Sequence, residues 1–288
     1  MTALLMTAQE LVAKAKNLPP VSYAALKLVN LLEQPTVSND EVVQVLKCDN
    51  VLTARLLRAC NSPYFGLEEP VFSVDQAVFL LGHQQILHIV LTLAFGSAMV
   101  APLPGYAMEV NELWRHALIT ATAAETVVGE IPELDVEPAV AFTIGLLHDI
   151  GKLVLAQALT VPMQEEIRRR VEVDLIMRIE AEKDVLGADH SEVGACLLRE
   201  WRLPEDIVEA VANHHRPVLE PRPRYSVITH LANAVAHLSG SAPGWDGYAT
   251  RVDDRVVRRF NLTGDKIESM VVGVRDSFDR VEQFMTMG

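Results

Sequence analysis

Apolar residues recur every three to four positions along most of this chain, which places them on one face of an α-helix. Runs in which apolar and polar residues alternate, as in a half-buried strand, are not found. The pattern therefore predicts an all-α protein. The predicted helices span residues 7–17, 22–33, 39–47, 50–60, 74–81, 83–100, 107–129, 136–158, 162–184, 190–201, 205–215, 223–239, 251–259 and 264–286.

Capping residues support several of these boundaries. Ser38 stands before an acidic first turn, and Ser73 precedes the helix predicted from Val74. Pro204 opens the helix predicted over 205–215, and Pro217 prevents it from continuing.

The segment 101–105, with two prolines and a glycine, is the best internal boundary. It divides an N-terminal helical lobe (1–103) from a second lobe (104–240), and a helical extension (241–288) follows. We expect a two-lobed stack of helices that share one interface. The amphipathic tail over 265–285 packs either on its own lobe or on a second copy of the chain, and the oligomeric state stays open.

Composition excludes several classes of protein. Half of the 288 residues are hydrophobic, which is enough for a sizeable core, and the net charge of −13 opposes general binding to nucleic acid. The apolar stretch 86–103 contains Gly96 and Ser97, and we interpret it as a core helix rather than a membrane span. Three widely spaced cysteines and the lack of a signal-like N-terminus favour the cytoplasm.

A histidine and an aspartate stand next to each other, as His148 and Asp149, in the otherwise apolar run 145–152. Burying both side chains costs free energy unless each finds a partner, and a divalent cation is a common one. Further histidines on three other predicted helices complete a candidate cage. They are His116, His190, His214 and His215. One or two ions of iron, manganese, zinc or nickel suit such mixed nitrogen and oxygen ligands.

Two more side chains share helical faces with this set. Glu112 lies one turn before His116, and Lys152 lies one turn after His148, where an ammonium suits a phosphate oxygen. The other histidines lack a carboxylate at helical spacing, and we interpret them as packed or surface residues. They are His83, His88, His230 and His237.

Several separated motifs resemble those of HDOD proteins, a bacterial signalling branch of the HD phosphohydrolase superfamily. They lie at residues 18–21, 56–66, 73–82, 145–152 and 190–215. The resemblance implies an all-α fold with an HD-type site in the C-terminal lobe. It also implies a regulatory or interaction module, because many HDOD domains have lost the metal ligands of the superfamily.

The chain keeps much of that ligand set and is similar to the related HD-GYP phosphodiesterases at the candidate residues. It departs from them in two places. The Gly-Tyr-Pro loop expected after the paired histidines is replaced by residues 216–221, and the late aspartate that closes the metal site is replaced by Asn233. The neutral amide of Asn233 is a weaker metal ligand than a carboxylate, so cyclic-dinucleotide hydrolysis is not expected to be efficient.

Two main functions are consistent with the sequence. One is a signalling module that binds a divalent metal and acts on a partner protein in trans. The other is a metal-dependent phosphohydrolase, in which Asp149 bridges a pair of metals and Lys152 steadies an oxygen of a phosphate-containing small molecule. A weaker third candidate is a di-iron oxygen or redox sensor.

Overall fold

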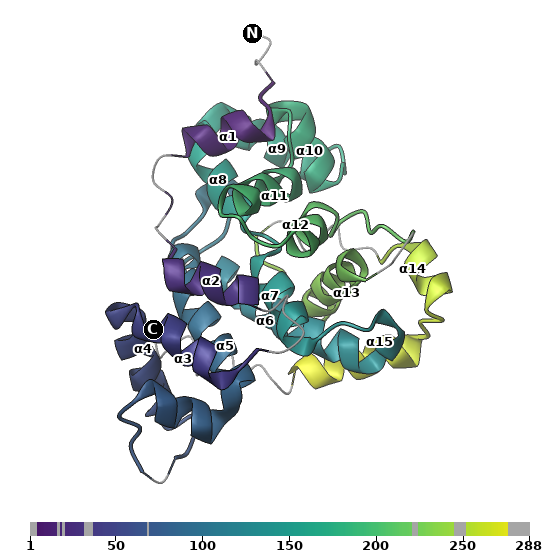
Figure 1. Cartoon of the computed structure of the whole chain (residues 1–288). Coiled ribbons are helices and arrows are strands. Elements are labelled where there is room, and N and C mark those ends of the chain that lie inside the picture. The colour runs from purple at the N-terminus through teal and green to yellow at the C-terminus, as the bar shows by residue number, and fades with distance from the viewer. Residues whose placement is uncertain are drawn as a thin grey trace.

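The computed structural model describes residues 5–15, 18, 21–31, 37–67, 69–220, 224–244 and 252–275. Within these ranges every regular element is a helix, apart from one isolated antiparallel bridge between Leu103 and Met108, so the all-α class is confirmed. The helices, shown in Figure 1, are α1 (Ala8–Lys14), α2 (Tyr23–Leu31), α3 (Asn39–Lys47), α4 (Asn50–Cys60), α5 (Val74–Met99), η1 (Pro104–Tyr106), α6 (Glu112–Glu130), η2 (Pro132–Leu134), α7 (Pro138–Leu147), α8 (Gly151–Ala158), α9 (Val161–Glu172), α10 (Arg178–Leu186), α11 (His190–Glu200), α12 (Glu205–Ala212), α13 (Tyr225–Leu238), α14 (Asp254–Arg259) and α15 (Gly264–Arg275).

Several predicted boundaries agree with the structure. The side chain of Ser38 accepts a hydrogen bond from the backbone of Glu41 at the start of α3, and Ser73 caps α5 in the same way. The sequence predicts two helices that meet at Gly82, and α5 has a break there, where Gly82 takes a φ of 78°. This backbone conformation is accessible to glycine and strained for other residues, so Gly82 sets the bend.

The predicted and observed helices differ most in three places. The helix predicted over 136–158 is two helices, α7 and α8, with His148 and Asp149 in the turn between them. The helix predicted over 162–184 is also two, α9 and α10, because Leu175 between them takes a φ of 55°. The helix predicted from residue 107 begins only at Glu112, because Asn111 takes a φ of 68°.

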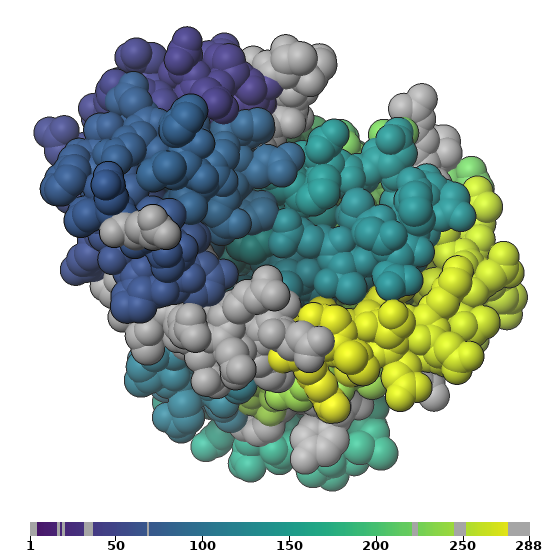
Figure 2. Space-filling view, turned by 90° about the horizontal axis from the view of Figure 1, so that it is seen from below, coloured from purple at the N-terminus to yellow at the C-terminus, as the bar shows by residue number. Residues whose placement is uncertain are grey.

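Helices α6, α7 and α13 pack together at the centre of the molecule, and the other helices lie around them (Figure 1). The first helix, α1, packs on α8 and α11 rather than on its neighbours in sequence, and the backbone N–H of Met6 donates to Leu186. At the other end α15 packs on α6 and α13, and Figure 2 shows the C-terminal helices against the central ones. The part of the predicted C-terminal tail beyond Arg275 lies outside the described residues.

Two stretches, Val74–Met99 and Pro138–Ala158, are long and apolar enough to cross a membrane by length and composition alone. Of their most apolar windows, 56% and 89% are buried inside the protein. Burial in the core accounts for this composition without a membrane, which agrees with the interpretation of 86–103 as a core helix.

Close approach between helix backbones holds the turn at His148 in place. A Cβ atom on Gly151 would lie 1.9 Å from the carbonyl oxygen of His190, and one on Gly145 would lie 2.7 Å from the Cα of Ala121. Gly151 therefore brings α8 against α11, and Gly145 brings α7 against α6. Because the contacting atoms belong to the backbone, neither contact tolerates a larger side chain without a shift of a whole helix.

A second polar group lies where α5 meets α6 and α7. The ring of His88 stacks on Phe142 with centroids 4.2 Å apart, and its Nε2 lies 3.5 Å from Oε1 of Glu125. Burial lowers the pKa of His88 to about 4. Burial also raises the pKa of Glu125 to about 7, so this carboxyl group holds its proton to unusually high pH.

We expect Gly151→Ala to destabilise the protein by about 3 kcal/mol or more, because the added methyl group drives α8 away from α11. The matched control is Gly129→Ala in α6, where an added Cβ meets open space. That change is expected to stabilise the helix by about 0.5–1 kcal/mol. Chemical denaturation measures both, and equal stabilities for the two variants would contradict the close approach.

The folded state holds the proton of Glu125 more tightly than the unfolded chain does. Its contribution to stability is thus present below about pH 4.5 and is lost as the pH rises through about 7. In a chelating buffer at pH 8 we expect Glu125→Gln to be about 1–2 kcal/mol more stable than the wild type, after allowance for a side chain that is 31% exposed.

The pH dependence of unfolding in urea tests this sign. His88 titrates in the opposite sense, because its lowered pKa costs stability only as the pH falls below about 6.5. The difference in stability between the variant and the wild type from about pH 6.5 to 8 therefore reports on Glu125, because the other groups that titrate there, such as His190, are present in both proteins. If Glu125→Gln is less stable than the wild type across this range, the fold stabilises the ionised form of Glu125, and the expected sign is wrong.

Candidate metal centre

Four segments of the chain bring the predicted ligands together. His116 comes from α6, His148 and Asp149 from the turn before α8, and His190 from the first position of α11. His214 and His215 come from the turn after α12, because this helix ends at Ala212 and not at His215 as the sequence predicts. We call these six residues the His–Asp cluster. All but the half-buried His215 are 0–2% exposed. Their ligand atoms form two groups, each compact enough to hold an ion: His116, His148 and Asp149, and His190, His214 and His215.

The carboxylate of Asp149 lies between these two groups. Its Oδ2 is 3.3 Å from Nε2 of His148 and 3.7 Å from Nε2 of His116. Its Oδ1 is 3.4 Å from Nε2 of His190 and 3.8 Å from Nε2 of His214. Each oxygen thus faces two imidazoles, and Asp149 is placed to contact an ion in either group.

Hydrogen bonds on the outer side of the rings orient the four imidazoles. Each Nδ1 lies 2.7–2.9 Å from a fixed acceptor, so in the neutral ring the proton sits on Nδ1 and the lone pair of Nε2 faces Asp149. The acceptors are the carbonyls of Ser241 for His116, Gly145 for His148 and Val211 for His214, and the carboxylate of Glu182 for His190.

The inner atoms of the cluster lack such partners. Among the described residues, no hydrogen bond reaches Nε2 of His148, Nε2 of His214 or Oδ1 of Asp149, although all three atoms are buried. Burial lowers the pKa of His116 and His214 well below the usual range, so these two rings stay neutral and Nε2 of His214 carries no proton. Unpaired lone pairs that converge on one point are the arrangement that a divalent cation satisfies, so the residues present fit the metal that the sequence predicts.

The charge state of the carboxylate agrees with this fit. Burial alone would raise the pKa of Asp149, but His148 and the ammonium group of Lys152 outweigh it and hold the pKa well below the usual range. Nζ of Lys152 lies 2.6 Å from Oδ2 of Asp149, and both side chains are buried. Asp149 is therefore ionised, with one oxygen already paired and the other facing imidazoles.

The remaining predicted residues differ in their placement. Oδ1 of Asn233 lies 3.1 Å from Nε2 of His116, beside the cluster. If the amide of Asn233 turns over, its Nδ2 donates to the lone pair of His116 Nε2, so this contact is satisfied with or without a cation. The carboxylate of Glu112 instead accepts a hydrogen bond from the backbone of Glu109, and neither ligand group of the described residues contains it.

Three residues near the cluster were not predicted from the sequence to belong to the site. Glu182 is fully buried and accepts hydrogen bonds from both the backbone and Nδ1 of His190. Burial would lower the pKa of His190, but Glu182 outweighs it and raises that pKa. Ser241 anchors His116, and the ring of His237 lies 4.9 Å from that of His116. His237 lies four residues after Asn233 on α13, so the helical spacing could have identified His237 as a neighbour of the site.

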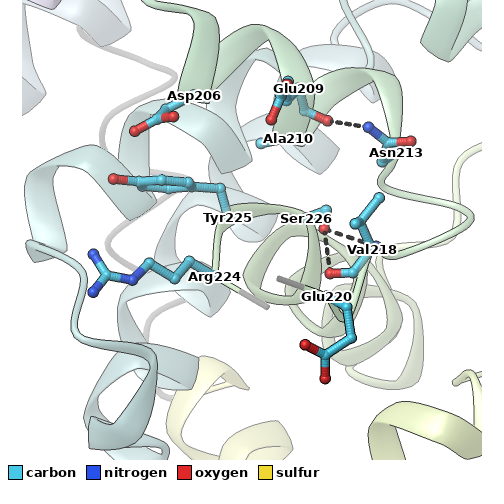
Figure 3. Close-up of a pocket in the computed structure, with 9 residues that line it drawn as sticks. All are labelled: Asp206, Glu209, Ala210, Asn213, Val218, Glu220, Arg224, Tyr225 and Ser226. Carbon is cyan, nitrogen blue, oxygen red and sulfur yellow. Dashed lines mark hydrogen bonds between the residues drawn. The ribbon is translucent and has the colours of Figure 1, made fainter. Parts of the chain in front are cut away.

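A pocket of about 240 Å³ opens between α12 and α13, next to the segment that follows His215 (Figure 3). Asp206, Glu209 and Glu220 line it with one arginine, Arg224, which is paired with Asp135 at 3.1 Å. Excess negative charge of this kind repels a phosphate group. The pocket is therefore unsuited to a phosphate-containing ligand.

The family model of the HDOD domain matches residues 18–217 of this chain. The chain belongs to the HDOD family. A crystal structure of an HDOD domain protein of unknown function from Geobacter sulfurreducens has a TM-score of 0.71 to this HDOD chain at 26% identity, over 95% of this chain and 96% of the other.

A candidate phosphohydrolase from Shewanella amazonensis SB2B has a TM-score of 0.67 at 24% identity, over 95% of this chain and 97% of the other, which supports the fold alone. An uncharacterized protein of Treponema pallidum (strain Nichols) is 23% identical over 242 residues. The match covers 79% of this chain and 44% of that relative, so the HDOD chain spans less than half of its length.

We expect Glu182→Gln to lower metal affinity by about 10–100-fold, because the amide no longer supplies the negative charge that makes His190 a strong ligand. The matched control, Glu180→Gln, changes an exposed carboxylate in the same helix and is expected to leave the affinity unchanged. Competition with a chromophoric chelator measures both. Equal affinities for the two variants would exclude Glu182 from the support of the cluster.

Proposed function

We propose that this HDOD protein is a signalling module in which the His–Asp cluster holds a divalent metal ion and that it turns over cyclic dinucleotides poorly or not at all. The observation that carries the proposal is the convergence of buried, unpartnered lone pairs on Asp149. Imidazole nitrogens and one ionised carboxylate suit iron, manganese, zinc or nickel. When bound, such an ion supplies Lewis acidity and lowers the pKa of a bound water.

The charges around Asp149 favour one half of the cluster for the first ion. Oδ2 already pairs with Lys152, whereas Oδ1 has no hydrogen bond and faces His190 and His214. An ion on the side of Oδ1 does not displace the ammonium group. His190, His214 and His215, together with Oδ1 of Asp149, are therefore the ligands that we assign to it.

The limited access to the His–Asp cluster favours metal binding over rapid turnover of a substrate. The ligands are 0–2% exposed except for His215, which is half-buried, so a bulky phosphodiester has little room to reach Asp149. Asn233 also stands where a carboxylate would add negative charge beside His116. We further propose that the module acts in the cytoplasm on a protein partner in trans, which its three free cysteines and its net charge of −13 support.

The second candidate is a metal-dependent phosphohydrolase, and a specific feature favours it. The position of Asp149 between the two ligand groups suits a carboxylate that contacts two ions at once. In this function Asp149 holds and orients the site, and Lys152 neutralises charge that develops on a phosphate oxygen. Its substrate would be a phosphate-containing small molecule.

Metal analysis of protein purified without a histidine tag tests the proposal. We expect at least about one transition-metal ion per chain, and we expect Asp149→Asn to lower that content, because the neutral amide replaces the central carboxylate. The matched control, Asp135→Asn, alters a carboxylate that is 81% exposed and is expected to keep the wild-type content. Wild-type protein that is metal-free after expression in metal-supplemented medium would refute the proposal.

A hydrolysis screen with added manganese or iron decides between the two functions. We expect no turnover of cyclic dinucleotides above that of the Asp149→Asn variant. Turnover by the wild type that Asp149→Asn abolishes and Asp135→Asn retains would establish the phosphohydrolase instead.

A further inference from the structure

One face of α13 runs along the His–Asp cluster. Four polar side chains recur there at intervals of four, three and four residues, which places them on one side of the helix: Ser226, His230, Asn233 and His237. The last two contact the ring of His116. The first two instead hydrogen-bond to the segment that follows α12. This face of α13 therefore contacts both halves of the cluster.

His230 joins two backbone segments. Its side chain is buried, and only 6% of the residue is exposed. Nδ1 lies 2.8 Å from the carbonyl oxygen of His214, and Nε2 lies 2.9 Å from the backbone nitrogen of Asp253. Because a carbonyl accepts and a backbone N–H donates, the neutral ring with its proton on Nδ1 satisfies both contacts. The ring therefore has one defined tautomer and bridges the two segments.

The contact with His214 fixes the peptide group between two predicted ligands. The carbonyl that accepts the hydrogen bond belongs to the planar peptide that joins His214 to His215. Rotation of this plane changes ψ of His214 and φ of His215, and with them the directions in which the two imidazoles point. Both residues lie after the end of α12, beyond the hydrogen bonds of the helix. His230 supplies a hydrogen bond in their place.

The other end of the bridge leads to the C-terminal helices. Asp253 is the N-cap of α14, and the chain continues from α14 into α15, which packs on α6 and α13. The segment between α13 and α14 also contacts a ligand directly, because the carbonyl of Ser241 accepts a hydrogen bond from Nδ1 of His116. The chain after α13 is thus connected to one ligand of each of the two groups.

We propose that His230 is a positioning residue for the metal centre, and that the C-terminal helices set through it how His214 and His215 present their imidazoles to the ion. The inference rests on the proposed function, because it concerns ligands that we assign there. Displacement of α14 removes the contact of Asp253 with His230, so it lowers metal affinity without touching a ligand. The C-terminal helices are therefore a regulatory element of the metal centre.

Two substitutions of His230 separate the ends of the bridge. In His230→Asn the amide donates at about the place of Nδ1, and in His230→Gln it accepts at about the place of Nε2. In the full-length, untagged protein, we expect His230→Gln to lower the affinity for cobalt about 10-fold and to change the visible absorption of the bound ion, because the peptide group of His214 is released. His230→Asn is expected to retain most of the affinity. The matched control, His83→Gln, alters a half-buried histidine outside the cluster and keeps both signals. Competition with a chromophoric chelator measures the affinities.

Asp253 tests the other end of the bridge. Its φ is −62°, a value that proline accepts, so Asp253→Pro removes the donating N–H, and the ring of the new residue pushes against His230. Asp253→Ala is the matched control, because it loses the same carboxylate and keeps the N–H. We expect the proline variant alone to weaken cobalt binding and to change the absorption. Should His230→Gln fail to fold, this pair gives the decision.

NMR of the imidazole nitrogens in the metal-free wild type adds a readout that is independent of the ion. We expect His230 to carry its proton on Nδ1. The opposite tautomer, or wild-type affinity and absorption in both His230→Gln and Asp253→Pro, would overturn the proposal. Equal losses in His230→Gln and His230→Asn would also overturn it, because the ring then acts through its packing alone. A wild type that binds no metal refutes the proposed function, whereas a metal-binding wild type that these variants match refutes only this inference.

Discussion

The burial of one ionised carboxylate, Asp149, among imidazoles is the constraint on which the central part of this fold depends. The group is 2% exposed and its pKa is held low, so it carries its charge where water does not compensate it. One oxygen pairs with Lys152, and the other faces only imidazole nitrogens. Every helix that supplies a neighbouring histidine must therefore hold its ring at a fixed distance and angle.

Backbone contacts provide that precision. Each inner histidine is anchored through Nδ1 to a carbonyl or carboxylate of its own or an adjacent element, and glycines allow the helices to approach closely enough for this. Gly145 and Gly151 stand on either side of the turn that carries His148 and Asp149. The turn is therefore fixed from both sides before any ligand binds, which lowers the entropic cost of holding an ion.

Much of this arrangement can be predicted from local sequence, and the exceptions have physical causes. The adjacent His148 and Asp149 stand out because a charged pair in an apolar run needs a partner, and Gly82 marks a break because only glycine adopts that backbone conformation readily. The turn after α7 escapes prediction because its apolar pattern continues across it, and His148 and Ile150 keep right-handed helical angles. Glu182 was not predicted because the charged residues around it in the sequence resemble the solvated face of a helix. Only the packing of α10 on α11 buries it. The division into lobes stays a prediction.

The internal charges explain why a neutral set of nitrogen ligands suits this site. Lys152 pairs with Asp149, and the guanidinium of Arg178 lies 3.9 Å from Glu182, and all four side chains are at most 4% exposed. Both of these carboxylates thus already have a buried cation beside them, and Asn233 adds no further negative charge. A divalent ion must then gain its binding free energy mainly from imidazole lone pairs rather than from uncompensated carboxylates. In the function that we propose, that balance favours a transition metal over magnesium and calcium, which prefer oxygen ligands.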